Sequence, residues 1–534
     1  MAYISSFKGQ NWLIPQSIND MIPKNHICFF VEEFVESLDF SGFDMINEGP
    51  GHPSYHPKII MKILLQGMLS KERSSRKLAS ATRENFVFMY LAEKVQPNFR
   101  TLCRFRADNA EFIKETFRET INLASENDLI DLSLICTDGS KIKANASKKR
   151  FLKEEQVEKL DSIIDAMIEE DIKQDEIDEK ISDGKEENLT NLETKNLKEI
   201  VKKYRNNKNK EKLKEKCNKA KEEIKRLGEK KRVSLTDPEC RMMKGKRGNN
   251  ELAYNTQFTV DSKNQIILAN DVCQDQNDTH QLQSQVRQTK KNIELNKDTK
   301  LAADCSYNNG DNLRFLEEEG IDGYIPNQSQ AQSFDEREQT IKQDDYDYDW
   351  DSDEIILEGV RLKFHAIWKH RGENKQRAYK SKDGKIIKKV PEFFRNRLRM
   401  KEKLDTEEGR KIYGLRKHLV EPVIGNIKYN LGLDEFSLRG LNSVKLELNL
   451  ASIAHNLKKI WIAKMRLTVN MDKKQLILDF CIIPQKLNVT QPVKCVVCDR
   501  HSFLGCSEIN HLLFNPLTKV SGLISDIRSS SAYN

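Results

Sequence analysis

Two short apolar segments, each ending at an aspartate, constrain the fold of this chain most strongly. Residues 132–137 read Leu-Ser-Leu-Ile-Cys-Thr and lead into Asp138-Gly139, and residues 299–303 read Thr-Lys-Leu-Ala-Ala and lead into Asp304. Apolar runs of this length, bounded by turn-forming residues, are typical of buried β-strands. We therefore expect a sheet in which two strands each end at a carboxylate, the first followed by a tight turn.

Further strands and a helix are predicted between and after these two segments. Apolar and β-branched side chains alternate with polar ones in residues 253–260, and a Ser-Lys-Asn turn leads to a second run at 265–269, so these two predict a hairpin. Residues 313–319 show the pattern of a helix that is capped by Gly320, and residues 324–326 that of another strand. Strands mixed with helices predict an α/β (α+β) domain.

Residues 1–130 and 405–465 carry apolar side chains at helical spacing instead. In the first region the Pro53/Pro57 pair suits a helix that starts just before Lys58. Basic residues gather between these N-terminal helices, and our candidates for contacts with DNA are Arg73, Arg76, Lys77, Arg104 and Arg106. The pattern fits a solvated helix surface as well as a helical domain whose basic face follows DNA phosphates.

Three other segments interrupt or follow the predicted sheet. Residues 148–232 are rich in Lys and Glu and keep apolar residues at helical spacing, with a break at Asp183-Gly184, which predicts a helical coiled-coil hairpin. This hairpin is either a solvated arm or an arm that dimerises or clamps DNA. Residues 328–395 are polar and poor in strand signals, and the structure of the tail at 466–534 is uncertain. We therefore divide the chain into a helical DNA-binding domain (1–130), a catalytic domain with two insertions (131–465) and this tail.

Composition adds weak constraints. The 534 residues include 89 Lys and Arg against 82 Asp and Glu, a net charge of +7, which hints at a polyanionic partner. The eleven cysteines are mostly scattered singly, which suits reduced thiols in a reducing compartment. The first ten residues show no apolar leader pattern, and no stretch of 18 apolar residues occurs. We expect a protein of the cytoplasm with no membrane partner.

Three acidic residues stand out by their positions. Asp138 and Asp304 follow predicted core strands, and Glu421 lies in a helical segment. Carboxylates at strand ends meet at one edge of a sheet, and a helix packed there can add a third. Such a cluster holds two hard cations about 3.5–4 Å apart. Among 82 acidic residues, however, position alone does not single out these three.

The residues around these acids resemble the signature segments of insertion-sequence DDE transposases. The segment Thr-Asp-Gly-Ser-Lys-Ile-Lys-Ala-Asn-Ala at 137–146 is similar to the family's first-aspartate segment, and Ala-Asp-Cys-Ser-Tyr-Asn at 303–308 to its second. The spacing of Tyr413, Arg416, Glu421 and Lys428 resembles the family's Tyr-Arg-Glu-Lys signature. Residues 51–106 resemble the helical domain that precedes the catalytic domain in this family. The three signature segments also occur in the family's order.

The resemblance implies an RNase H-like mixed sheet flanked by helices, and transposition of the cut-and-paste type. It implies that Asp138, Asp304 and Glu421 bind two Mg²⁺ or Mn²⁺ ions, and that Tyr413, Arg416 and Lys428 hold phosphates of the transposon end. A packing role for the Tyr413 ring is the alternative. The implied partners are double-stranded DNA, both the terminal inverted repeats and the target, and a second copy of the chain on paired ends. The implied location is a prokaryotic cytoplasm.

Three other functions compete with an active transposase. A catalytically inactive DNA-binding protein of transposase descent would not need to keep all three acids, which argues for activity. An RNase H-like nuclease would share the metal chemistry, so the residues do not separate hydrolysis from strand transfer. A structural coiled-coil protein would explain residues 148–232 alone.

The tail carries a possible zinc motif. Cys495 and Cys498 form a Cys-x-x-Cys pair, and Cys506 and two histidines follow. Structural zinc sites usually combine two such pairs, and this tail has one. We therefore favour reduced thiols over a Zn²⁺ site here.

Overall fold

The structure is a computed structural model, and it describes residues 17–46, 54–169, 200, 207–228, 231–245, 248–334, 346–369 and 375–486. Contacts divide the chain into two compact units, Met1–Met465 and Arg466–Asn534. All side chains discussed below belong to the first unit. The division into DNA-binding domain, catalytic domain and tail stays a prediction.

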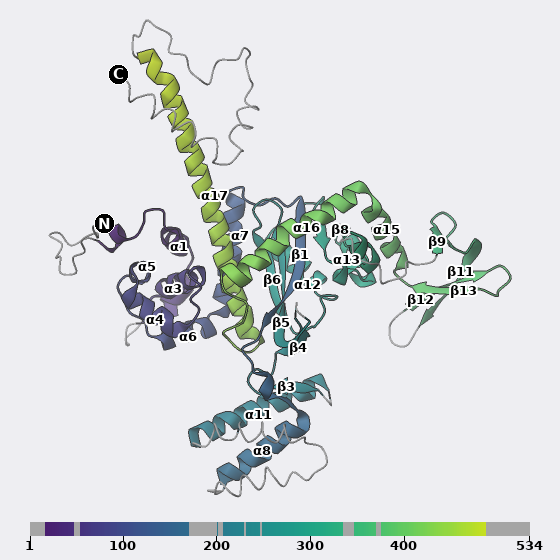
Figure 1. The fold of residues 1–534 in the computed structure, drawn as a ribbon, viewed down its shortest axis with the longest axis horizontal. Coiled ribbons are helices and arrows are strands. Elements are labelled where there is room, and N and C mark those ends of the chain that lie inside the picture. Colours follow the sequence, from purple (N-terminus) through teal and green to yellow (C-terminus); the bar gives the residue numbers. More distant parts are fainter. Residues whose placement is uncertain are drawn as a thin grey trace, which may run out of the picture. The chain divides into compact units, whose positions relative to one another are not determined.

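A mixed sheet forms the centre of the first unit (Figure 1). Its order is β4-β5-β1-β7-β8, and β6 also pairs with β5. Strand β5 runs antiparallel to β1 and β6, whereas β7 runs parallel to both β1 and β8. This topology confirms the predicted α/β class and is consistent with an RNase H-like fold. The strands are β1 (Leu134–Lys143), β4 (Arg241–Lys244), β5 (Asn250–Asp261), β6 (Ile267–Cys273), β7 (Lys300–Ala303) and β8 (Asp322–Tyr324).

Strand β1 is longer than the sequence pattern indicates. We predicted a turn after Asp138, but β1 continues through this residue to Lys143, because β5 pairs with it from Ile135 onward. Gly139 serves close packing instead of a turn: a Cβ atom at this position would lie 2.5 Å from Nε2 of Gln257 on β5.

Helices pack on this sheet and carry the remaining parts of the site. Helix α12 (Leu282–Asn292) packs on β5 and β6, and α16 (Glu407–Gly425) contacts β1, β5, β7 and β8 (Figure 1). Helix α13 (Gly310–Glu318) matches the helix predicted at 313–319. A 3-10 turn (Cys305–Tyr307) follows β7, and α14 (Gln328–Phe334), α15 (Phe394–Asp405) and α17 (Leu441–Lys486) complete the set.

The N-terminal region is helical, as the sequence indicates. Helix α3 begins at Pro57, where proline suits the first helical position, and the His56 side chain accepts a hydrogen bond from the Lys58 amide. Buried faces of these helices share one core with the sheet. The helices are α1 (Ile27–Glu36), α2 (Ser41–Ile46), α3 (Pro57–Leu69), α4 (Ser75–Glu84), α5 (Phe86–Leu91), α6 (Phe99–Asp108) and α7 (Ala110–Glu126), preceded by a 3-10 turn (Ile18–Met21).

Two helices form the described part of the insertion at 148–232. Helix α8 (Glu154–Glu169) packs on α11 (Asn207–Leu227), and their apolar faces make a small core of their own. A 3-10 turn (Lys148–Arg150) leads into the arm, and the short strands β2 (Phe151–Lys153) and β3 (Arg232–Ser234) pair at its base. The predicted break at Asp183-Gly184 lies outside the described residues.

The insertion at 328–395 differs from its predicted strand-poor character. It contains a five-stranded antiparallel sheet of order β13-β12-β11-β10-β9. Its strands have only a small core to cover, so apolar alternation is weak in the sequence. They are β9 (Tyr346–Asp349), β10 (Glu354–Leu357), β11 (Val360–Lys369), β12 (Lys375–Ser381) and β13 (Ile387–Pro391).

Two further observations concern composition. No helix among the described residues has both the length and the apolar character that a membrane crossing needs. The seven cysteines of the described part are free thiols, and four of them are buried. The candidate zinc ligands Cys495, Cys498 and Cys506 lie outside the described residues.

Candidate active site

The register of the central sheet brings the first two acids together. Strands β1 and β7 run parallel, and their last paired residues are Thr137 and Ala303. Asp138 and Asp304 each follow this pair directly, so two residues far apart in the sequence leave the same edge of the sheet side by side. Asp304 follows its strand as predicted, whereas Asp138 lies within β1 at the point where the pairing with β7 stops, and the two residues still come together.

Helix α16 supplies the third acid and the cation that joins all three. Its residue Arg416 donates from Nη1 to Oδ2 of Asp138 at 2.8 Å, and its Nη2 lies 3.6 Å from Oδ1 of Asp304. The same Nη2 lies 3.9 Å from Oε1 of Glu421, a little more than one helical turn further along. The three acids thus converge on one guanidinium group.

Burial differs among these four side chains. The Arg416 side chain is 7% exposed and that of Asp138 18%, whereas Glu421 is 54% exposed. Burial raises the pKa of Asp138 to about 6; Arg416 opposes this shift, and the Asp304 charge adds to it. Burial also acts against the charge of Arg416, but the carboxylates of Asp138 and Asp304 raise its pKa above the ordinary value. The guanidinium group therefore stays charged.

A solvent-open cavity of about 540 Å³ lies over these groups. Its walls come from the sheet edge, from α16 and from α14, and its lining residues are Asp138, Asp304, Cys305, Gln328, Ala331, Gln332, Arg416, Lys417 and Glu421. Within the described part of the chain, no three His, Cys, Asp or Glu side chains stand close enough to hold a metal ion as they are. The donor set nevertheless suits a hard cation, because three carboxylates already gather around one positive charge.

Lys428 belongs to the same edge of the sheet but contacts β1. A π-helical turn (Asn426–Asn430) follows α16, so Lys428 does not continue the α-helical register of Glu421. Its Nζ donates to Oγ of Ser140 and to the carbonyl oxygen of Lys141, at 2.6 Å each. The side chain thus ties the end of α16 to the strand that carries Asp138.

We expect Lys428→Met to lower the free energy of unfolding by about 2 kcal/mol, because two charge-assisted hydrogen bonds to β1 are lost. Ser140→Ala should cost less, since the Lys141 carbonyl oxygen remains as a partner. Chemical denaturation of both variants measures this difference. Unchanged stability of the Lys428 variant would show that its side chain is free to reach DNA instead.

Tyr413 is a packing residue in this structure. It is 5% exposed, its ring centroid lies 5.7 Å from that of Phe334, and the Arg416 guanidinium carbon lies 5.6 Å from its ring. The ring therefore supports Arg416 from the side. A phosphate contact by Tyr413, expected from the family resemblance, stays a prediction.

A buried polar network on the opposite face of β1 was missed by sequence reasoning. Asp278 accepts hydrogen bonds from Asn255 at 2.6 Å and Gln257 at 2.8 Å, and its other oxygen lies 3.4 Å from the Lys141 ammonium group. The Tyr307 hydroxyl donates to Gln257. Since Tyr307 ends the turn after Asp304, the network anchors the segments that carry both aspartates. The sequence feature that could have predicted this network is the polar side chain at every second position of β5.

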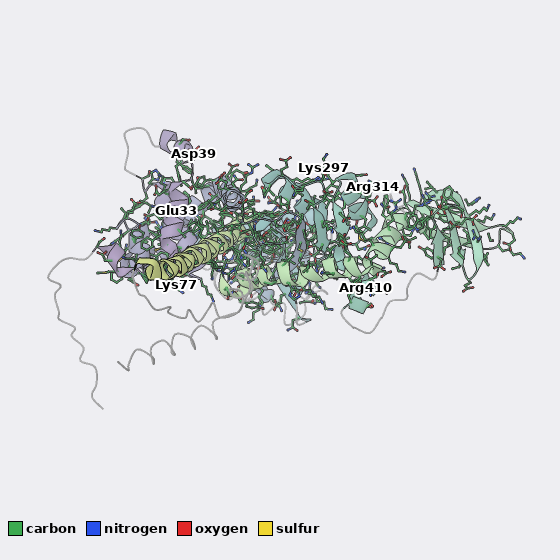
Figure 2. All side chains as sticks on the ribbon, turned by 90° about the horizontal axis from the view of Figure 1, so that it is seen from above. Glu33, Asp39, Lys77, Lys297, Arg314 and Arg410 are labelled. Carbon is green, nitrogen blue, oxygen red and sulfur yellow. The ribbon has the colours of Figure 1, made fainter. Side chains whose placement is uncertain are left out.

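The basic residues of the N-terminal helices divide into two groups. Arg73 donates to Glu447 at 2.7 Å and to the carbonyl oxygen of Glu435 at 2.7 Å, and the buried Arg106 donates to Ser75. These two are used inside the protein. The exposed members are Arg76, Lys77 (Figure 2) and Arg104.

Two segments of the chain match known family models. Residues 373–461 match the transposase DDE domain, and residues 16–108 match the transposase domain DUF772. Both matches are to transposase families, and together they support an insertion-sequence DDE transposase. No curated protein and no solved structure matches it.

The two matched segments cover only part of the candidate site. The DDE match includes α16 with Arg416 and Glu421, and the N-terminal match includes α1 to α6. Transposases act on DNA, and DDE transposases in general use divalent metal ions. Asp138 and Asp304 lie outside both matches, so their assignment rests on the sheet register and on their contacts with Arg416.

Proposed function

We propose that this transposase cleaves DNA at the ends of an insertion sequence and joins the freed 3′ ends to a target, using two divalent metal ions. The observation that carries the proposal is the convergence of Asp138, Asp304 and Glu421 on Arg416 at the floor of one open cavity. Carboxylate oxygens are the donors that Mg²⁺ and Mn²⁺ prefer.

Asp138, Asp304 and Glu421 would hold the two ions. When bound, such ions activate a water molecule or a DNA 3′-hydroxyl group and stabilise the leaving oxygen. The sheet fixes Asp138 and Asp304 by their shared register, whereas Glu421 is more exposed and is placed by α16. The chain thus offers two ligands placed by the sheet and one placed by a helix.

Arg416 would change partners when the site is loaded. In the structure its guanidinium group neutralises the three carboxylates. Divalent ions would take over this neutralisation, and the planar guanidinium group would then be available to a DNA phosphate, which it can bind through two parallel hydrogen bonds. Arg416 would thereby serve both the metal-free and the DNA-bound site.

The exposed residues Arg76, Lys77 and Arg104 are the proposed phosphate contacts of the N-terminal helices. We expect each replacement by glutamine to weaken binding to duplex DNA and to reduce the slope of log affinity against log salt by about one. Arg73→Gln is the contrasting variant: it should lower thermal stability, because the buried Glu447 loses its partner. Fluorescence anisotropy at several salt concentrations and thermal melting separate the two groups. Equal effects on DNA binding would contradict the division.

An excision and joining assay tests the proposed reaction. Purified protein is mixed with Mg²⁺, DNA that carries the element's own ends, and a target plasmid. Excised ends that are covalently joined to the target support a transposase. Cleavage without joining would favour a nuclease, and binding without cleavage would favour the alternative of an inactive DNA-binding descendant. Because two ends must be held together, we expect a homodimer on paired ends, which light scattering of the DNA complex measures.

A further inference from the structure

The five-stranded insertion sheet has two different faces. One face packs on α15 through a small core of Ile355, Leu362, Tyr379, Val390 and Phe394. Side chains alternate between the faces of a strand, so the residues between these core positions point the other way. We call this other side the open face; its side chains include Arg361, Lys363, Trp368, Lys380 and Lys389.

Positive charge gathers on β11–β13 of the insertion sheet, whereas residues 346–359, with β9 and β10, carry six Asp and Glu and no Lys or Arg. Residues 360–391 contain eleven Lys and Arg but two Asp and Glu. The Lys363 side chain is 81% exposed, and its nearest acid, Glu354, lies 3.6 Å away. Within the described ranges, Lys380, Lys382 and Lys385 form no ion pair. These three lysines add to a region in which Arg361, Lys363, Lys375 and Arg377 are paired with acids of the protein.

Two pairs of lysines face each other across β11 and β12, and Glu354 on the other side of Lys363 offsets part of the first repulsion. On the open face Lys363 lies directly opposite Lys380 on the neighbouring strand, and at the strand ends Lys369 lies opposite Lys375. Like charges that face each other across strands are destabilising. A polyanion bound across the strands would remove this repulsion.

The open face also presents an exposed aromatic side chain beside a lysine. Trp368 is 45% exposed, and the Lys389 ammonium group lies 3.9 Å from its ring centroid. This cation–π contact holds Lys389 in place. Between the Trp368 end and the Lys363–Lys380 pair, the paired residues are Ala366 and the fully buried Ala378.

The connections of the sheet lead directly to the catalytic cavity. Before it in the chain lies α14, whose residues Gln328, Ala331 and Gln332 line that cavity, and after it come α15 and then α16 with Glu421. A ligand on the open face is therefore tethered, at both ends of the insertion, to elements of the active site.

We propose that the open face binds the sugar-phosphate backbone of duplex DNA next to the site of cleavage. Lysines act as point charges for phosphates, and release of counterions from duplex DNA supplies the binding free energy. The choice of DNA as the polyanion rests on the proposed function. The charge pattern and the geometry of the face do not depend on it.

The test compares two triple variants of the full chain that lose the same charge. The first is Lys363→Gln, Lys380→Gln and Lys389→Gln. The control is Lys244→Gln, Lys291→Gln and Lys297→Gln, at exposed positions outside the N-terminal helices and the insertion sheet (Lys297 is labelled in Figure 2). The probe is a short fluorescent duplex of arbitrary sequence, titrated over a range of salt. We expect the open-face variant to lose about two to three units of the log–log salt slope, and the control variant to keep the wild-type slope.

Three outcomes would overturn the proposal. The first is an equal loss of slope in both triple variants. The second is tighter binding of the wild type to single-stranded DNA, with that preference lost in Trp368→Ala, because the face would then recognise bases. The third is binding to vesicles of anionic lipid through these lysines while duplex binding is unchanged. If the wild type excises DNA and one of these outcomes occurs, the inference alone fails; if it neither excises nor binds DNA, the proposed function fails with it.

Discussion

Asp138→Asn is expected to reduce DNA cleavage by at least about a thousandfold, because a metal-binding carboxylate contributes several kcal/mol to the transition state. Asp304→Asn and Glu421→Gln should cause losses of the same order. Binding to transposon-end DNA should remain, since the exposed basic residues of the N-terminal helices are unchanged. Cleavage of end-labelled DNA and anisotropy with the same DNA measure the two properties separately.

Asp322→Asn is the matched control for these variants. Asp322 belongs to β8 of the same sheet. In the strand register it lies opposite Lys300 at the start of β7, away from the edge that carries Asp304. The same chemical change there should leave cleavage close to the wild-type rate. If any one of the three acid variants cuts as fast as this control, that acid is not part of the site.

Arg416→Met should destabilise the metal-free protein by about 2–3 kcal/mol, because Asp138 is left buried beside two other acids without a counter-charge. Mg²⁺ should restore more stability to this variant than to the wild type, since no guanidinium group competes for the carboxylates. Thermal melting with and without Mg²⁺ measures both effects.

Arg410→Met is the control for the Arg416 variant, because Arg410 lies on the same helix but is exposed. It should change neither the stability nor the response to Mg²⁺. If Mg²⁺ raises the melting temperature equally in the wild type, Arg416→Met and Arg410→Met, then metal ions do not replace Arg416 as the partner of the carboxylates.

The sequence contains enough information to predict the central sheet and the positions of its two aspartates. Short apolar runs are reliable when both faces of a strand are buried, as in β7 before Asp304. The length of β1 was not predictable from this signal, because residues 139–143 are mostly polar and their strand conformation depends on pairing with β5.

The insertion sheet β9–β13 was missed for a related reason. Its core is small, and β12 reads Lys-Gln-Arg-Ala-Tyr-Lys-Ser, in which Tyr379 is the one large apolar residue. A strand stabilised by neighbouring strands and by long basic side chains leaves little apolar periodicity in its sequence.

The side-chain partners of the site also lay beyond sequence reasoning. The family resemblance points Arg416 toward DNA phosphates, whereas the packing of α16 turns it onto Asp138. Arg73 and Arg106 belong to the same basic run as Lys77, but tertiary contacts direct them inward. A sequence pattern shows that a residue is basic, but it does not show which acidic residue lies next to it in the folded protein.

The short pair of strands at the base of the helical arm has a consequence for how such a chain can change over time. Phe151 pairs with Ser234, so the two ends of the arm lie next to each other although more than 80 residues separate them. Closing a longer loop costs little extra entropy. The arm can therefore lengthen, shorten or be exchanged for another module while the strands that carry Asp138 and Asp304 keep their register. Such a junction offers an accessory part to natural selection, or to a protein engineer, that is separable from the catalytic chemistry.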